Sequence, residues 1–451
     1  MPPVILRFIE NAVRFAVVQE EQMRPYLEEL WLVFKVWWWV FPPFILWGPL
    51  KFMWLWWRQG LWDNKQKKIL LEIKIPEDSL KPIRAMEPVL NGFWQLYSPP
   101  NWYEKWWEGQ FLLWFSFEIV SLEGTPHFYI RMPERYRNIA ESHIYSQYPE
   151  AEITVVDDYV KKVPPDIPSK DWEMWGADYR ILKSEAYPIR TYVDFETEHE
   201  AKEEKRVDPM ASLLEGMAKI GPGEQLWVQI MAKPYLGDPT EGERDWKAEA
   251  RKIRDLEAKR TKKEKPMKLM IEEMWDLLIH AKPPGQAVEE EKEMFPAELK
   301  LTPGERDVVA GIERKISKLG FECNVRYIYL AKRDVFFGGH VRMAMSYFTN
   351  FISGNLNAMV PWGKMLTKIK RNWYNWFWFV KRRLYLKKRQ LFRRYCIRVT
   401  PLFPLGGGTF ILNSEELATI YHFPSRIVAP AATVPRVEAR KGEAPANLPI
   451  E

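Results

Sequence analysis

The residues best suited to binding chemistry lie between Lys364 and Arg398, where cations alternate with aromatic side chains. This segment contains 13 Lys or Arg residues and no Asp or Glu, and because the net charge of the chain is +6, the other residues sum to −7. Such a local excess of cations indicates a surface for an anionic partner. The predicted binding cations are Lys368, Lys370, Arg371, Lys381, Arg382, Arg383, Lys387, Lys388, Arg389, Arg393 and Arg394.

Two anionic partners fit this segment. Nucleic acid would place its phosphates on the cations and stack its bases on the aromatic rings. Anionic lipid would use the same cations, at about 1 kcal/mol each, while the aromatic cluster inserts at the membrane interface. We favour lipid because six aromatic residues lie within seven positions, and we expect Trp373, Trp376 and Trp378 at the interface. A basic helix that only pairs with the acidic remainder of the chain is the third interpretation.

A second aromatic cluster lies in the stretch PPNWYEKWWEGQ, which is too rich in Pro and Trp for an ordinary polar loop. Trp102, Trp106 and Trp107 could enter a membrane interface, since an indole ring has an apolar body and one polar atom. They could equally fill a gap between domains, and this packing interpretation is the one we prefer.

Catalytic signatures are absent from the sequence. No GxxxxGK[ST] nucleotide loop, GxSxG elbow or HExxH metal motif occurs, and the six His residues are scattered. The acidic run at Glu289, Glu290 and Glu291 is typical of a solvated face. We therefore predict a protein that is not an enzyme and that needs no metal or cofactor.

The elements that would position these residues begin with an apolar stretch over residues 29–62. Val36 to Trp57 has the length that a helix needs to cross a bilayer core of roughly 30 Å, and Trp residues lie near both ends. Pro42 and Pro43 leave a re-entrant hairpin open, but a single transmembrane helix is preferred. Residues 1–28 form an amphipathic segment before it.

Orientation follows from the charges that flank the apolar stretch. Arg58, Lys65, Lys67 and Lys68 lie at its C-terminal end, whereas Glu residues crowd its N-terminal side. Because basic residues stay on the cytoplasmic side, we expect a cell-membrane protein with most of the chain in the cytoplasm.

Residues 66–160 show the pattern of a ferredoxin-like domain. Apolar residues alternate at 71–75, recur at helical spacing from Ile83 to Phe93, and return as two strands, a helix and a last strand. This β-α-β-β-α-β order is the split βαβ arrangement.

The remaining chain repeats the order of elements. We predict a linker over 161–190, a second ferredoxin-like domain over 191–360 with a charged insertion at 237–299, and a strand at Val193 and Phe195. Capping boxes are expected at Thr302 with Glu305 and at Asn413 with Glu416. The basic-aromatic segment (361–399), a capped helix (400–428) and a flexible tail (429–451) complete an α+β fold.

Several stretches together resemble a known bacterial family. LEIKIPEDSLKPIRAMEPV, PPNWYEKWWEGQ, LTPGERDVVAGIERKISKLGF and ILNSEELATIYHFP are similar to the membrane-anchored N-terminal region of conjugative coupling ATPases of the type IV secretion and HerA-like kind. In that family a RecA-like motor domain follows the last stretch.

The resemblance implies a non-enzymatic, membrane-anchored platform for a DNA translocation ATPase that is carried on a separate chain. Its expected partners are membrane lipid, the motor ATPase, DNA and further copies of the same chain. The alternative is a membrane-bound nucleic-acid-binding protein that acts without a motor.

Overall fold

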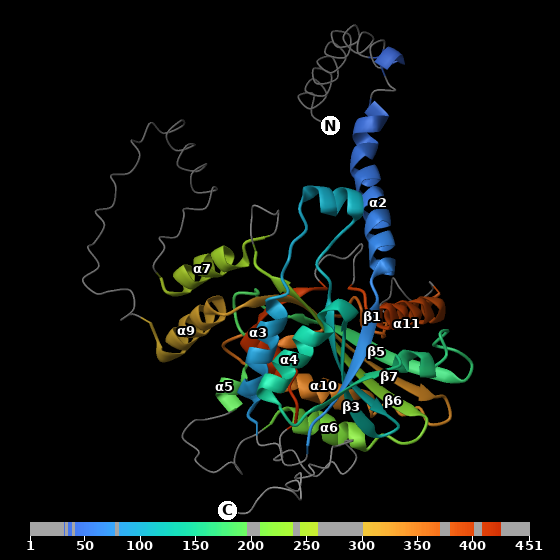
Figure 1. Ribbon diagram of the computed structural model, residues 1–451, viewed down its shortest axis with the longest axis vertical. Coiled ribbons are helices and arrows are strands. Elements are labelled where there is room, and N and C mark those ends of the chain that lie inside the picture. Colours follow the sequence, from blue (N-terminus) through green and yellow to red (C-terminus); the bar gives the residue numbers. More distant parts are fainter. Residues whose placement is uncertain are drawn as a thin grey trace, which may run out of the picture. The chain divides into compact units, whose positions relative to one another are not determined.

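The computed structural model in Figure 1 describes residues 31, 35–37, 41–76, 81–195, 208–237, 244–259, 301–369, 379–400 and 408–424. The chain forms two compact units, residues 1–66 with 99–111 and residues 67–98 with 112–451. The predictions for residues 1–28, for the tail at 429–451 and for most of the charged insertion lie outside the described residues.

The smaller unit contains the helix α2 (Phe41–Lys65) and the short π-helix η3 (Glu104–Glu108). η3 ends at Gly109, whose φ of 76° is left-handed. A Cβ at this position would lie 2.4 Å from the backbone carbonyl oxygen of Arg58. Glycine is therefore required where η3 ends against α2.

The predicted transmembrane helix is wrong. No helix in the described part of the chain is long and apolar enough to cross a membrane. α2 reaches the length, but Pro49, Lys51, Arg58 and several amphipathic Trp side chains lower its mean hydropathy.

The larger unit is built on one antiparallel sheet. Its strands are β1 (Lys68–Lys74), β2 (Phe115–Leu122), β3 (Thr125–Pro133), β4 (Glu152–Val156), β5 (Trp172–Ile181), β6 (Glu224–Tyr235), β7 (Gly320–Lys332), β8 (Met359–Pro361) and β9 (Phe410–Asn413). The strand order is β4-β1-β3-β2-β6-β7-β5-β8, and β9 pairs with the start of β7.

The two predicted domains are halves of this single sheet. The first four strands have the order β4-β1-β3-β2, and the next four repeat it in reverse as β6-β7-β5-β8. β2 and β6 join the halves through a continuous register from Phe115 opposite Ala232 to Leu122 opposite Gln225. The tandem arrangement of separate domains is therefore corrected to one continuous sheet within one compact unit.

Helices cover both faces of the sheet. The longer ones are α3 (Met86–Trp94), α4 (Arg137–Gln147), α6 (Met210–Ala218), α7 (Trp246–Glu257), α9 (Pro303–Ser317), α10 (Val341–Thr349) and α11 (Val380–Ile397). The short ones are η2 (Ile83–Ala85), η4 (Glu134–Tyr136), η5 (Tyr159–Lys162), α5 (Tyr192–Phe195) and α12 (Ser414–Ile420). Both predicted capping boxes are confirmed, at the starts of α9 and α12.

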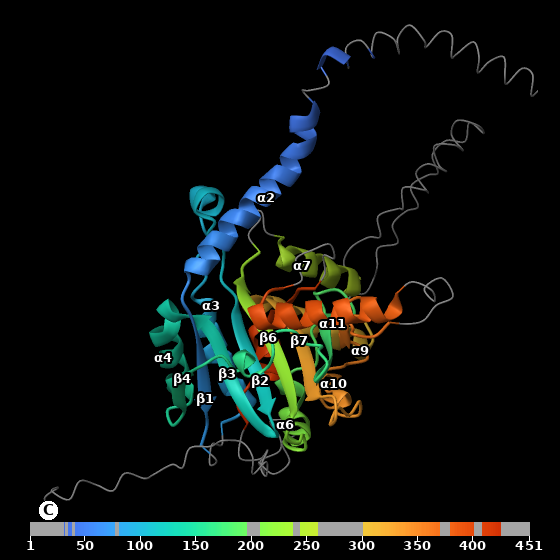
Figure 2. The ribbon, with the colours of Figure 1, turned by 90° about the vertical axis from the view of Figure 1, so that its right-hand side faces the viewer.

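Alternation along the strands divides the buried side chains between two layers. In β7, Val325 and Tyr327 belong to the main core under α3, α4, α6, α10 and α12, whereas Ile328 and Leu330 belong to the core under α11. Figure 1 shows α3, α4 and α10 on one side of the sheet and α11 on the other. In Figure 2, α11 runs across β6 and β7.

The segment predicted as a linker, residues 161–190, contains β5, which pairs with β7 inside the sheet. The many Pro residues around it hid this strand. The strand predicted at Val193 and Phe195 is instead the short helix α5. Within the predicted charged insertion, α7 buries Trp246 and Ala250, so this part is packed rather than merely solvated.

Candidate functional site: a basic helix on the sheet

α11 carries most of the predicted binding cations that the structure describes. Its inner side packs Leu391, Phe392 and Tyr395 against Trp227 and other apolar residues of the sheet. The ring centroids of Trp227 and Tyr395 lie 5.3 Å apart. The helix is therefore a fixed part of the larger unit.

The C-terminal end of α11 is held by Arg398, a buried residue that follows the helix. Its guanidinium donates to Glu118 at 2.7 and 3.0 Å and to Asp158 at 2.7 and 3.0 Å. Burial would raise the pKa of the Glu118 carboxyl, but Arg398 and hydrogen bonds from Ser116 and Tyr159 lower it below its usual value. The site therefore holds an ionised pair away from water.

Three further cations of α11 are engaged in ion pairs with the larger unit. Lys388 lies 2.7 Å from Glu173, Arg389 lies 2.9 Å from Asp166, and Arg394 lies 3.4 Å from Asp178. These three residues, which the sequence placed in the binding surface, face acidic partners of the same chain. On this side of α11, the third interpretation of the sequence applies, in which basic residues of the helix pair with acidic residues of the same chain.

The outer side of α11 has a different composition. Arg382, Leu386, Gln390, Arg393 and Ile397 follow one another at intervals of three or four residues, and all five side chains are exposed. Leu386 is 53% exposed and Ile397 is 61% exposed. We call these five residues the outer stripe, in which two cations alternate with two bulky apolar side chains.

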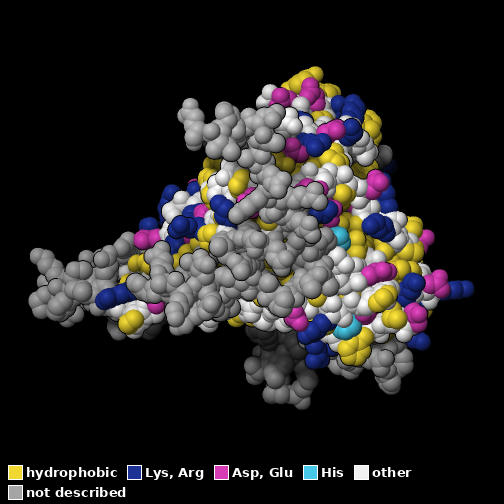
Figure 3. Space-filling model, turned by 60° about the horizontal axis from the view of Figure 1, so that its bottom comes forward, with side chains coloured by type: hydrophobic (Ala, Val, Ile, Leu, Met, Phe, Trp, Pro, Cys, Tyr) yellow, Lys and Arg dark blue, Asp and Glu magenta, His cyan; other side chains and the backbone are white. Residues whose placement is uncertain are grey.

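The other predicted cations differ in accessibility. Lys368, Lys381 and Arg383 are exposed, and Lys387 is half-buried. Burial and the nearby Arg383 lower the pKa of Lys387. Lys370, Arg371, Trp373, Trp376 and Trp378 lie outside the described residues. On the face seen in Figure 3, the coloured Lys or Arg and Asp or Glu side chains are interspersed.

The second aromatic cluster forms η3 in the smaller unit. Trp106 is half-buried, with the ammonium of Lys51 at 4.6 Å from its ring centroid, whereas Trp102 is 69% exposed and Trp107 is 49% exposed. Trp106 thus packs within its own unit, and Trp102 and Trp107 extend toward solvent.

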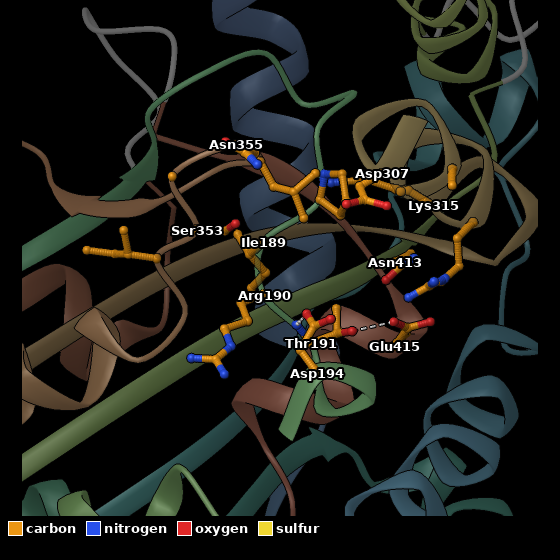
Figure 4. Close-up of a pocket in the computed structure, with 17 residues that line it drawn as sticks. Ile189, Arg190, Thr191, Asp194, Asp307, Lys315, Ser353, Asn355, Asn413 and Glu415 are labelled. Atoms are coloured by element: carbon orange, nitrogen blue, oxygen red, sulfur yellow. Dashed lines mark hydrogen bonds between the residues drawn. The ribbon is translucent and has the colours of Figure 1, made fainter. Parts of the chain in front are cut away.

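A cavity of about 560 Å³ lies between the 188–191 segment, α9 and the 352–356 loop (Figure 4). Figure 4 shows Thr191 and Glu415 pointing toward each other, and their hydroxyl and carboxylate oxygens lie 2.5 Å apart. The guanidinium of Arg190 lies over the Phe195 ring at 4.3 Å. Asp194 and Asp307 balance Arg190 and Arg314, so the lining has no excess of one charge. In the described part of the chain, no group of acidic, His or Cys side chains is arranged to hold a metal ion.

The stretch ILNSEELATIYHFP, which contributed to the family resemblance, builds a buried polar network. Glu416 completes the capping box of α12 with Asn413, pairs with Lys315 at 3.0 Å and accepts from the Ile189 backbone at 2.8 Å. Ser414 donates to Glu87 at 2.9 Å, and Lys318 binds both Glu87 and Glu415 at 2.8 Å. These polar residues connect α3, α9 and α12. The capping box predicted from the sequence gave the start of α12 but not these connections.

Beneath α11 lies a row of buried polar residues that the sequence analysis did not predict. Glu118, Gln229, Arg326 and Asp178 lie directly opposite one another on β2, β6, β7 and β5, and all four are fully buried under α11. The signal in the sequence was the presence of polar residues at inward positions of these strands, such as Gln225 with Gln229 and Asn324 with Arg326. The row exists only through the register of four strands that are far apart in sequence.

The fold and the site define an α+β protein whose single antiparallel sheet carries a basic helix on one face. A family model described as a domain of unknown function (DUF8128) matches residues 114–356, more than half of the chain, so the chain belongs to this family. No curated protein and no solved structure matches the chain. The matched residues include β2 to α10, whereas α2 and α11 lie outside the match.

Proposed function

We propose that this chain is a non-enzymatic platform that binds an anionic membrane surface through the outer stripe of α11. The main observation that supports this proposal is the alternation of Arg382 and Arg393 with Leu386 and Ile397 on the exposed side of a helix whose other side is packed into the core. Cations bind anionic headgroups, and apolar side chains between them enter the layer below. The cytoplasmic leaflet of the cell membrane carries such lipids, and it is the surface that we propose.

The apolar members of the stripe favour lipid over nucleic acid. Phosphate oxygens would attract the Arg side chains equally well, but they would leave Leu386 and Ile397 without a matching partner. Phe379, immediately before the helix, is 70% exposed and adds a third large apolar side chain. A bilayer interface accommodates all of these groups together.

The proposed protein partner of the platform is a DNA translocation ATPase on a separate chain. Support comes from the resemblance of the sequence to the N-terminal region of coupling ATPases and from the missing nucleotide loop. In-cell cross-linking of the full chain should then enrich a protein with Walker motifs. Enrichment of membrane proteins without any such ATPase would contradict this part of the proposal.

A nucleic-acid-binding protein without a motor is the second candidate. The observation that favours it is the group of exposed cations Lys381, Arg382 and Arg383 at the start of α11. Their pattern is sufficient for contact with a phosphate backbone.

The test uses co-sedimentation of the full chain with vesicles of phosphatidylcholine and phosphatidylserine. Replacing Lys381, Arg382 and Arg393 together by Ala should weaken binding roughly 100-fold, because each cation near the surface contributes about 1 kcal/mol.

The matched control replaces three exposed cations elsewhere, Lys81, Arg251 and Arg306, by Ala. It loses the same net charge and should bind nearly as well as wild type. Equal losses in both variants would show that total charge, rather than α11, determines binding.

A further inference from the structure

The smaller unit displays an aromatic surface that the α11 proposal does not use. η3 is attached to α2 by polar contacts to its backbone, since Trp54 Nε1 donates to the Trp106 carbonyl oxygen at 2.9 Å and the Arg58 guanidinium donates to that of Trp107. Figures 1 and 2 both show the 99–111 segment beside α2. These contacts hold the rings of η3 in defined positions.

Most of the large apolar side chains that the structure describes in this unit are exposed to solvent. Large exposed fractions are found for Trp47 (68%), Leu50 (55%), Phe52 (59%), Met53 (62%), Trp56 (64%), Trp57 (51%), Trp102 (69%), Tyr103 (59%) and Trp107 (49%). Successive helical residues are rotated by about 100°, so positions 52, 53, 56 and 57 lie within an arc of about 140°, and the exposed Leu50 and Trp47 widen this arc to about 220°. A protein partner that covers one face of α2 would leave some of them exposed.

The side-chain types indicate what covers this surface. Trp and Tyr combine an apolar ring with one N–H or O–H group, and they are most stable at the level of lipid headgroups, where both parts are satisfied. Lys51 and Arg58 are the only charged residues between positions 41 and 62. Both lie against Trp rings, Lys51 at 4.6 Å from Trp106 and Arg58 at 5.9 Å from Trp54, and both suit an environment of phosphate groups.

We propose that α2 and η3 form an aromatic membrane-contact element whose exposed Trp and Tyr side chains enter the interfacial layer of a phospholipid bilayer. The contact is made by apolar side chains, so it does not depend on anionic lipid. The outer stripe of α11 depends on lipid charge, and the two elements are therefore separable by experiment.

The experiment measures binding of the full chain to vesicles of phosphatidylcholine alone at high salt, where charge attraction is screened. Wild type should bind. Replacing Trp56, Trp102 and Trp107 together by Ser should lower the partition coefficient roughly tenfold or more, because three apolar rings no longer leave water. The matched control replaces three exposed apolar residues of the larger unit, Leu182, Leu256 and Ile352, by Ser and should bind like wild type.

A second measurement locates the contact directly. A polarity-sensitive fluorophore is attached to a cysteine introduced by Tyr103→Cys or, as control, by Glu150→Cys, both in a chain with Cys396→Ser. The first label should shift its emission to the blue on phosphatidylcholine vesicles and be quenched by lipids that carry a quencher. The label at position 150, which is exposed in the larger unit, should not respond.

Each alternative outcome has a distinct meaning. Binding to anionic vesicles at low salt without binding to phosphatidylcholine would overturn the aromatic element and leave the α11 proposal intact. Binding to phosphatidylcholine that does not increase with anionic lipid would support the aromatic element and would contradict the α11 proposal. A wild type that self-associates through Trp56, Trp102 and Trp107 and ignores vesicles would identify a second copy as the occupant and would also overturn the inference.

Discussion

At the scale of single residues, the row Glu118, Gln229, Arg326 and Asp178 explains why α11 lies where it does. If α11 and the residue after it contributed only apolar side chains, the charged residues of this row on β2, β7 and β5 would be buried without partners from that segment. Arg398 neutralises Glu118, and Arg394 lies 3.4 Å from Asp178. A buried charge without its partner costs several kcal/mol, so helix and row must be present together.

Replacing Glu118 by Gln tests this pairing. The change removes one of the two carboxylates that pair with the buried Arg398 and leaves Asp158 as the other, so it should reduce the free energy of unfolding by about 1 to 3 kcal/mol. Urea unfolding followed by circular dichroism measures the difference. Glu150→Gln, at an exposed position, is the control and should change stability by less than about 0.5 kcal/mol. Similar small effects at both positions would show that the pair is not important for stability.

Glu87 predicts a pH dependence of stability. Burial would raise its pKa, but hydrogen bonds from Lys318, Tyr192 and Ser414 lower it below the usual value of 4.5. A carboxyl whose folded pKa is lowered stabilises the fold above its unfolded pKa, and this stabilisation is lost as the pH falls through the folded pKa. Wild type should therefore lose more stability than Glu87→Gln as the pH falls below 4.5. Parallel stability curves for the two proteins, measured by urea unfolding across this range, would contradict the assignment.

At the scale of elements, α11 has two sides with different tasks. The inner side packs into the core, and the side chains of the outer stripe are exposed. The sequence indicated a cationic segment, because composition shows charge density directly. It did not indicate which cations are paired, because Glu173 and Asp166 lie on or beside β5, more than 200 positions away along the chain. That assignment required the tertiary structure.

Two Leu→Ala substitutions on α11 separate its sides. Leu391→Ala removes a fully buried side chain and should cost about 2 to 5 kcal/mol of unfolding free energy. Leu386→Ala removes an exposed side chain and should change stability by less than about 0.5 kcal/mol, while it weakens binding to anionic vesicles. Denaturant unfolding and vesicle co-sedimentation measure the two effects. The description of the helix would be wrong if Leu386→Ala destabilised the fold as much as Leu391→Ala.

At the scale of the whole molecule, the sequence predicted element types better than their assembly. The period-two pattern at 71–75 falls in β1 except for its last residue, since β1 ends at Lys74. The junction of β2 with β6 was not visible, because every residue in it fits an internal strand of either half equally well. The predicted membrane span failed for another reason, since the apolar run from residue 30 contains Trp, Pro and cations that reduce its hydropathy.

The continuous sheet predicts that both halves unfold together. Ile119 and Val228 are opposite each other at the β2–β6 junction, and both are fully buried. Ile119→Asp should place a charge in this junction and lower hydrogen-exchange protection in β1 and β3 and in β5 and β7 by similar amounts. Loss of protection in β1 and β3 alone would indicate two independently folding halves.

The most direct test of the central claim is a titration of the full chain with three anionic partners, namely phosphatidylserine-containing vesicles, single-stranded DNA and duplex DNA, at low and high salt. The outer stripe of α11 predicts saturable binding to these vesicles that weakens at high salt, because salt screens the attraction between Arg382 and Arg393 and the anionic headgroups. DNA binding should be weaker under the same conditions. Tight, salt-sensitive binding of DNA without vesicle binding would contradict a membrane platform and would identify the chain as a nucleic-acid-binding protein.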